Sequence, residues 1–198
     1  MKLNRNFYDR DARIVAEDLI GKILVRKYGD TVIKSRIVET EAYIGAIDKA
    51  SHGYGGKVTP RTKIMYGPPG YAYVYLIYGM YYCLNFVTEK EGVCSAVLIR
   101  AVEPLLNEEE MSINRYGKQL KELTKYQKKN ISNGPGKLCN ALKITIKHYG
   151  ADLTGDEIYV EDDGYRDFKT EKSKRINIDY AEEAKNFLWR YTIQHNKA

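Results

Sequence analysis

The feature that most restricts the fold is a tyrosine-rich stretch in which large phenols alternate with smaller apolar residues. Tyr71, Tyr73 and Tyr75 each precede an apolar residue. A period of two predicts a β-strand, because successive side chains of a strand point to opposite faces. Tyr78 precedes a glycine and a second run of strand-forming residues, so we expect a β-hairpin over residues 71–87.

Further strands and short helices account for the rest of the chain. Alternating apolar residues and turn signals predict the strands, and apolar residues three or four positions apart predict the helices. The predicted strands are 22–28, 31–43 and 93–102, with short strands after residue 144; the predicted helices are 9–19, 107–129 and 137–142. We expect an α+β fold: a single domain over residues 1–198 with a mixed, largely antiparallel curved sheet, flanking helices and the protruding hairpin.

The composition indicates the cellular compartment of the protein and the class of molecule that it binds. No apolar run approaches the roughly 18 residues that a membrane span needs, and no secretory signal is visible, so we expect neither membrane insertion nor secretion. Three cysteines without a Cys-x-x-Cys pair favour a reduced, cytoplasmic setting and no metal site. The net charge of +6 favours a polyanionic partner such as nucleic acid, although a basic surface is also typical of ordinary soluble proteins.

Two glutamates lie on one predicted strand. Alternation places four residues of the strand 31–43 on a single face: Ile37, Glu39, Glu41 and Tyr43. A carboxylate beside an aromatic ring can activate a water against a flat, stacked substrate. Glu41 is therefore a candidate catalytic group, although the same pattern is typical of a solvent-facing edge strand with two inert glutamates.

The tyrosines have a functional interpretation of their own. Seven of the 18 tyrosines fall between positions 66 and 82. Tyrosine combines a stacking face with a hydrogen-bonding tip, and a nucleobase needs both. Tyr78 lies at the predicted turn, from which a ring can project and wedge base steps apart. The strand propensity of tyrosine explains several of these residues, but not so dense a run.

Two loops contain further, weaker candidates for functional residues. His52 lies in a loop after the strand 31–43, where a histidine can contribute hydrogen bonds or be a plain surface residue. The Gly-Pro-Gly sequence that ends at Gly136 precedes Lys137 and a predicted helix. A helix start of this kind exposes backbone N–H groups to phosphate, although Gly and Pro also simply break helices.

Several spaced motifs in register resemble the alkyladenine (3-methyladenine) DNA glycosylase family of the mammalian type. The resemblance extends from about Phe7 to Tyr191 and is strongest from Lys34 to Pro104. The motifs, in chain order, are Arg36-Ile37-Val38-Glu39-Thr40-Glu41-Ala42-Tyr43, Ala50-Ser51-His52, Thr59-Pro60-Arg61, Tyr73-Val74-Tyr75-Leu76-Ile77-Tyr78-Gly79-Met80-Tyr81, Asn85, Leu98-Ile99-Arg100-Ala101-Val102-Glu103-Pro104 and Gly134-Pro135-Gly136-Lys137-Leu138-Cys139.

The resemblance implies a base-flipping enzyme of DNA repair. It implies that Tyr78 enters the minor groove from the hairpin and that the flipped base lies between Tyr43 and Tyr75. His52 would contribute to the pocket wall. Asn85 would lie near the pocket floor and select against the exocyclic amino group of normal guanine.

The resemblance also implies the chemistry. Glu41 would act as the general base on a water that Arg100 helps to hold, with Glu39 and Lys137 in support. An alkylated purine with a fixed positive charge is already a good leaving group, so one carboxylate suffices. No lysine stands in the pocket motifs as a Schiff-base nucleophile, so we expect a monofunctional enzyme that leaves an abasic site. Gly136 and Lys137 are the candidate phosphate contacts.

The expected partner is double-stranded DNA with a damaged purine, and the expected enzyme is a cytoplasmic, nucleoid-associated monomer without a cofactor. Its lesions would include 3-methyladenine and hypoxanthine. Residues 107–133 and 161–163 match the family poorly, so no role is assigned to them. Two alternatives stay open from the residues alone: a sugar hydrolase in which Glu39 and Glu41 form the carboxylate pair, and a non-catalytic nucleic-acid-binding module that stacks bases on tyrosine.

Overall fold

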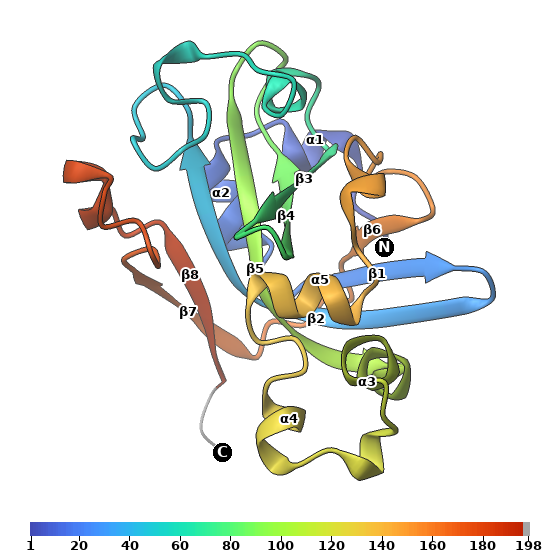
Figure 1. Cartoon of the computed structure of the whole chain (residues 1–198). Helices are drawn as coiled ribbons and strands as arrows, with labels where there is room; N and C mark the ends of the chain where they lie inside the picture. Colours follow the sequence, from blue (N-terminus) through green and yellow to red (C-terminus); the bar gives the residue numbers. More distant parts are fainter. Residues whose placement is uncertain (196–198) are drawn as a thin grey trace.

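One antiparallel sheet organises the computed structural model, which describes residues 1–195. Its strand order is β3-β4-β5-β2-β1-β6, and β8 adds to β2 and carries β7 on its other side (Figure 1). The strands are β1 (Ile23–Tyr28), β2 (Thr31–Ile44), β3 (Ala72–Ile77), β4 (Tyr81–Val87), β5 (Ser95–Leu106), β6 (Ile158–Glu161), β7 (Phe168–Ser173) and β8 (Arg190–His195).

Short helices and 3₁₀ turns connect the strands. Two of the helices, α2 and α5, pack on the central strands and bury their apolar sides there (Figure 1). The helices are α1 (Arg5–Tyr8), α2 (Ala12–Asp18), α3 (Glu108–Tyr116), α4 (Lys125–Lys129) and α5 (Pro135–Ala141); the 3₁₀ turns are η1 (Tyr54–Gly56), η2 (Lys63–Tyr66), η3 (Leu120–Glu122), η4 (Ile146–His148) and η5 (Glu182–Asn186).

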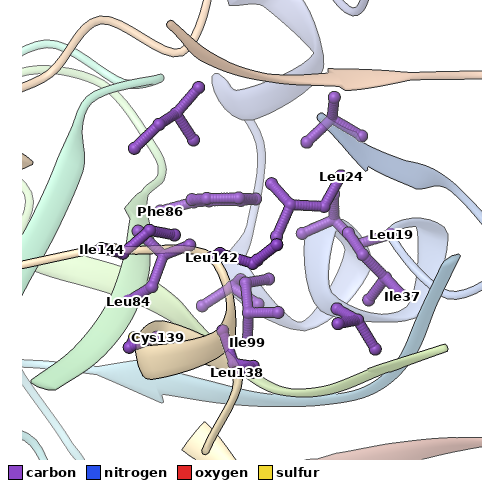
Figure 2. Packing of buried hydrophobic residues seen from close by; sticks show 14 of the residues in the cluster. Leu19, Leu24, Ile37, Leu84, Phe86, Ile99, Leu138, Cys139, Leu142 and Ile144 are labelled. Atoms are coloured by element: carbon purple, nitrogen blue, oxygen red, sulfur yellow. The ribbon is translucent and has the colours of Figure 1, made fainter. Parts of the chain in front are cut away.

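The main core lies between the sheet and these two helices. Phe86 of β4 and Ile99 of β5 meet Leu138 of α5 in this cluster, and Leu19 packs in from the end of α2 (Figure 2). Because strand residues alternate between faces, their neighbours on β4 and β5 point to the opposite side of the sheet. That opposite side is where the polar and aromatic residues gather.

The two longest strands, β2 and β5, pair irregularly near their middle. Ile37 pairs with Val102, Glu39 with Ala101 and Thr40 with Ile99. The ladder therefore skips Val38 on β2 and then Arg100 on β5, which together form a local β-bulge. The bulge shifts the alternation by one residue. Ile37 therefore packs in the core, and the prediction that it shares a face with the two glutamates was wrong.

The predicted α+β fold with a largely antiparallel sheet and a β-hairpin is confirmed. Every strand pairing among residues 1–195 is antiparallel, so the described sheet contains no parallel pair. The helix predicted over 107–129 is broken: α3 ends at Gly117, which has a φ of 65°, and α4 begins only at Lys125. Within the described residues, no helix is both long and apolar enough to cross a membrane.

Thr40 links β2 to α2, and a substitution there tests this packing. Its buried hydroxyl donates a 2.7 Å hydrogen bond to the carbonyl of Ala16, in the last turns of α2. Thr40→Val keeps the shape but leaves that carbonyl without this donor, so we expect the free energy of unfolding to fall by about 1–3 kcal/mol in urea titrations. Thr170→Val on the outer strand β7 is the control, and equal losses in the two variants would contradict the assignment.

Candidate active site

A cavity of about 420 Å³ opens on the side of the sheet away from the main core. This volume is within the range of small-molecule sites, which measure about 300–1,000 Å³. Its walls come from strands β2 to β5, from the loop before η1, from the start of α5 and from a segment before η5. The residues that carry the chemistry among its lining are Tyr43, His52, Tyr73, Tyr75, Cys83, Asn85, Arg100, Lys137 and Tyr180.

The candidate base Glu41 lies behind the cavity wall rather than in it. Its side chain has no solvent exposure and is covered by Tyr43 and Arg100, which do line the cavity. One carboxylate oxygen, Oε2, accepts a 2.7 Å hydrogen bond from the Tyr43 hydroxyl and a 3.4 Å hydrogen bond from Nη1 of Arg100. The other, Oε1, accepts a 2.8 Å hydrogen bond from the backbone N–H of Ile176.

Glu39 anchors the arginine that reaches Glu41. Its Oε1 accepts hydrogen bonds from Nε of Arg100 at 2.8 Å and from Nε of Arg190, on β8, at 2.6 Å. Burial lowers the pKa of Arg100, but the negative charges of Glu41 and Glu39 outweigh it and raise the pKa above its ordinary value. Two carboxylates and two guanidinium groups thus balance each other beneath the cavity.

An aromatic wall faces this charged group across the cavity. The His52 ring packs edge-on against Tyr75, with 4.7 Å between ring centroids, and its Nδ1 lies 2.8 Å from the Tyr73 hydroxyl. Burial raises the pKa of both tyrosines, so their phenols stay protonated. Desolvation by the cavity wall and the positive charge of Arg61 lower the pKa of His52 to about 4, so its imidazole is neutral at pH 7.

Asn85 lines the cavity, and two hydrogen bonds to strand backbone fix its amide. Its Nδ2 donates a 3.1 Å hydrogen bond to the carbonyl of Tyr73 and a 3.5 Å hydrogen bond to that of Cys83. Both bonds go to strand backbone, and the side chain is almost completely buried. They leave the amide oxygen as the group that Asn85 can offer to a molecule in the cavity.

The hairpin β3–β4 ends in an exposed aromatic tip. Tyr78 and Gly79 both have positive φ, 54° and 69°, and the N–H of Met80 donates to the carbonyl of Ile77. Three residues, 78–80, thus connect Ile77 to its strand partner Tyr81, and glycine at the second of them accepts the left-handed backbone readily. The Tyr78 side chain is 72% exposed and lines the rim of the cavity.

The two predicted phosphate contacts also line the cavity. A Cβ on Gly136 would lie 2.9 Å from Cβ and Cγ of Tyr81, so this glycine lets α5 pack closely against the hairpin. Nζ of Lys137 donates a 2.5 Å hydrogen bond to Oδ1 of Asn130. Lys137 is thus a cavity lysine, contrary to the expectation that the pocket carries none, and its phosphate contact stays a prediction.

Comparison with known proteins identifies the family. The family model described as Methylpurine-DNA glycosylase (MPG) matches residues 6–197. A protein of Alkaliphilus oremlandii is 59% identical over 196 residues, which cover 99% of this chain and 97% of the relative. A protein of Clostridium novyi is 57% identical over 196 residues, which cover 99% of this chain and 96% of the relative. A protein of Clostridium perfringens is 56% identical over 200 residues, which cover 100% of this chain and 98% of the relative. All three are named "Putative 3-methyladenine DNA glycosylase".

This chain belongs to the methylpurine-DNA glycosylase family.

Membership confirms the family resemblance and decides between the alternatives. A methylpurine-DNA glycosylase is a hydrolase that cuts an N-glycosidic bond, it is an enzyme of DNA repair, and its partner is DNA. The sugar hydrolase and the non-catalytic binding module are therefore excluded. Within residues 1–195 of this glycosylase, no three His, Cys, Asp or Glu side chains lie together as a metal would need.

The segment that precedes η5 contributes to the site of this glycosylase, and the sequence did not reveal it. Ile176 supplies the backbone donor to Glu41, and the neighbouring Arg175 forms a buried ion pair with Asp48. Tyr180 lines the cavity with 69% of its side chain exposed. A backbone donor leaves no mark in a sequence, and Arg175 follows Lys174 in a polar stretch typical of a solvated surface; only the isolated Tyr180 was a signal that could have drawn attention.

The protonation state of His52 gives a direct test of the described surroundings of its ring in the cavity wall. The folded pKa lies below the ordinary value of 6.5, so in ¹H NMR titrations the His52 ring signals should change at a pH well below 6.5, near 4. Arg61→Gln should raise that midpoint, because removing a nearby positive charge favours the protonated ring. His52→Gln assigns the signals, and a wild-type midpoint at or above 6.5 would contradict the described environment.

Proposed function

We propose that this glycosylase flips a damaged purine out of duplex DNA into the cavity and hydrolyses its N-glycosidic bond with a water activated by Glu41. The observation that carries the proposal is a fully buried carboxylate, linked to Tyr43 and Arg100, directly behind an aromatic cavity. The lesions include 3-methyladenine and hypoxanthine. The enzyme acts as a monomer, and its product is an abasic site in an uncut strand.

The cavity suits a flat ring that carries positive charge. Tyr43 and Tyr75 both line it, and we assign them to the two faces of the bound base, where cation–π attraction contributes roughly 0.5–2 kcal/mol. The phenols and the imidazole of His52 are neutral at pH 7, so no positive charge on this wall repels an alkylated base. The guanidinium of Arg100 is neutralised by the two glutamates behind it.

The attacking water reaches Glu41 past Arg100. Of the three hydrogen bonds that Glu41 accepts, the one from Arg100 is the longest, at 3.4 Å, against 2.7 and 2.8 Å for the others. A water that replaces this long contact lies between the carboxylate and the guanidinium, at the cavity edge. Glu41 then takes up the proton of the water and stabilises positive charge that develops on the sugar.

The lesion leaves without a covalent enzyme intermediate. 3-Methyladenine carries a fixed positive charge and departs as a neutral base without an acid, whereas neutral hypoxanthine takes up a proton from solvent as it leaves. Lys137, a lysine of the cavity lining, lies on α5 and is engaged with Asn130. We assign Lys137 and Gly136 to the DNA backbone, at the rim rather than at the sugar. The amide oxygen of Asn85 discriminates between bases at the floor.

Glu41→Gln tests the catalytic assignment. The amide keeps the size of the side chain but cannot take up a proton, so single-turnover release of 3-methyladenine should fall by about 10²–10⁴-fold. Binding to duplex DNA with an abasic-site analogue should stay at the wild-type level. Glu91→Gln, in an exposed loop between β4 and β5, is the matched control. Excision by Glu41→Gln at the wild-type rate would rule Glu41 out as the base.

Tyr78→Ser tests the wedge. Extrusion from a duplex requires unstacking, which costs a few kcal/mol, whereas a lesion in single-stranded DNA is already accessible. We therefore expect the variant to lose excision from duplex DNA while excision from a single strand is nearly unchanged. Tyr126→Ser on α4 is the control, because Tyr126 is equally exposed, at 74%, and does not line the cavity. An equal loss on both substrates would argue against a wedge.

A further inference from the structure

A second charged pair lies behind the cavity, apart from the Glu39–Arg100 group. Asp48 and Arg175 have no solvent exposure on either side chain, and both guanidinium nitrogens Nη1 and Nη2 donate to the Asp48 carboxylate. Taking two charges out of water is costly, and such a pair is often no more stabilising than apolar residues of the same size. Its presence beside the site therefore calls for a role other than stability.

The guanidinium of Arg175 holds β2 at the residue between Glu41 and Tyr43. Nη1 donates a 2.9 Å hydrogen bond to the carbonyl of Ala42, and Nη2 donates a 3.2 Å hydrogen bond to that of Ala184. The same group lies 4.7 Å from the centroid of the Tyr43 ring. One side chain thus fixes the backbone of β2 and one aromatic face of the cavity.

The next residue along the chain donates to the catalytic carboxylate. The N–H of Ile176 is 2.8 Å from Oε1 of Glu41, so the position of Arg175 sets the position of this donor. On the other side, Oδ1 of Asp48 accepts a 3.0 Å hydrogen bond from the N–H of Ala50, at the start of the loop that carries His52. The ion pair therefore joins three walls of the cavity: β2, the His52 loop and the segment before η5.

We propose that Asp48 and Arg175 are positioning residues for catalysis, which together present the Ile176 N–H to Glu41 and hold the Tyr43 ring against the bound base. The inference rests on the proposed function, in which Glu41 is the general base. Neither residue touches the substrate; each acts through the geometry of Glu41 and Tyr43.

The consequence for chemistry lies in the orientation of the Glu41 carboxylate. Its Oε1 is held by the N–H of Ile176, whereas its Oε2 is held by Tyr43 and Arg100. Displacement of Ile176 therefore releases one end of the carboxylate, and a misplaced reacting group lowers the rate of the chemical step.

Asp48→Asn and Arg175→Lys are the primary variants. Each keeps much of the side-chain volume and loses the paired hydrogen bonds of the guanidinium and carboxylate. We expect single-turnover excision of 3-methyladenine to fall by about 10²-fold, the loss that small misplacements of reacting groups produce. Affinity for duplex DNA with an abasic-site analogue should be unchanged, so that the loss falls on the chemical step and not on binding.

A double variant separates positioning from folding. Asp48→Leu with Arg175→Met removes both charges together, a replacement that buried ion pairs often tolerate without loss of stability. We expect a folded protein with a lower melting temperature, because the carbonyls of Ala42 and Ala184 lose a donor. It should excise slowly and bind the abasic-site analogue as the wild type does. Lys49→Gln is the control, because it breaks the neighbouring surface ion pair with Glu182 and should change neither the excision rate nor the affinity.

Different results would overturn the positioning role of Asp48 and Arg175 and the proposed function. A wild-type excision rate in the double variant would overturn the positioning role while leaving the proposed function intact. If no variant folds, the pair is a requirement of folding and the inference is overturned as well. If the wild-type protein releases no damaged base from DNA, or Glu41→Gln excises normally, the proposed function fails first.

Discussion

The pairing of β2 with β5 is the interaction on which the other parts of the molecule depend. β4 and its hairpin join the outer edge of β5, while β1 and β8 divide the free edge of β2 between them. The irregular pairing near Val38 turns both glutamates to the cavity side while Ile37 stays in the core. A regular ladder would place Ile37 beside the glutamates on the same face.

The carboxylates are kept behind the cavity, whereas neutral aromatic faces line it together with the basic side chains of Arg100 and Lys137. Glu39 and Glu41 are balanced by Arg100 and Arg190, and a separate pair, Asp48 with Arg175, balances itself. In the proposed reaction this division has a physical use. A cationic base meets neutral rings, while the sugar, where positive charge develops, lies nearest to the buried carboxylate. Pre-arranged charges of this kind need little rearrangement during the reaction.

Sequence patterns predicted the parts of the site that local rules govern. The alternation at Tyr73 and Tyr75 gave a strand, and the glycine after Tyr78 gave the turn, because both depend on neighbours in the chain. The bulge at Val38 could not be predicted, since it depends on the register of a strand some 60 residues away. The same applies to Arg175, whose partner Asp48 is 127 residues distant in sequence and adjacent only after folding.

The order of these parts along the chain has a consequence for a protein that is still being made. The stacking tyrosines, the hairpin tip and Lys137 are complete before the chain reaches Arg175, Ile176 or Arg190. Until those residues arrive, β2 lacks the strand that covers its second half, and Glu41 lacks its backbone donor. Under the proposed function, a growing chain therefore contains its DNA-contacting residues well before it contains the full set of donors around Glu41. The last quarter of the polypeptide completes the proposed catalytic site.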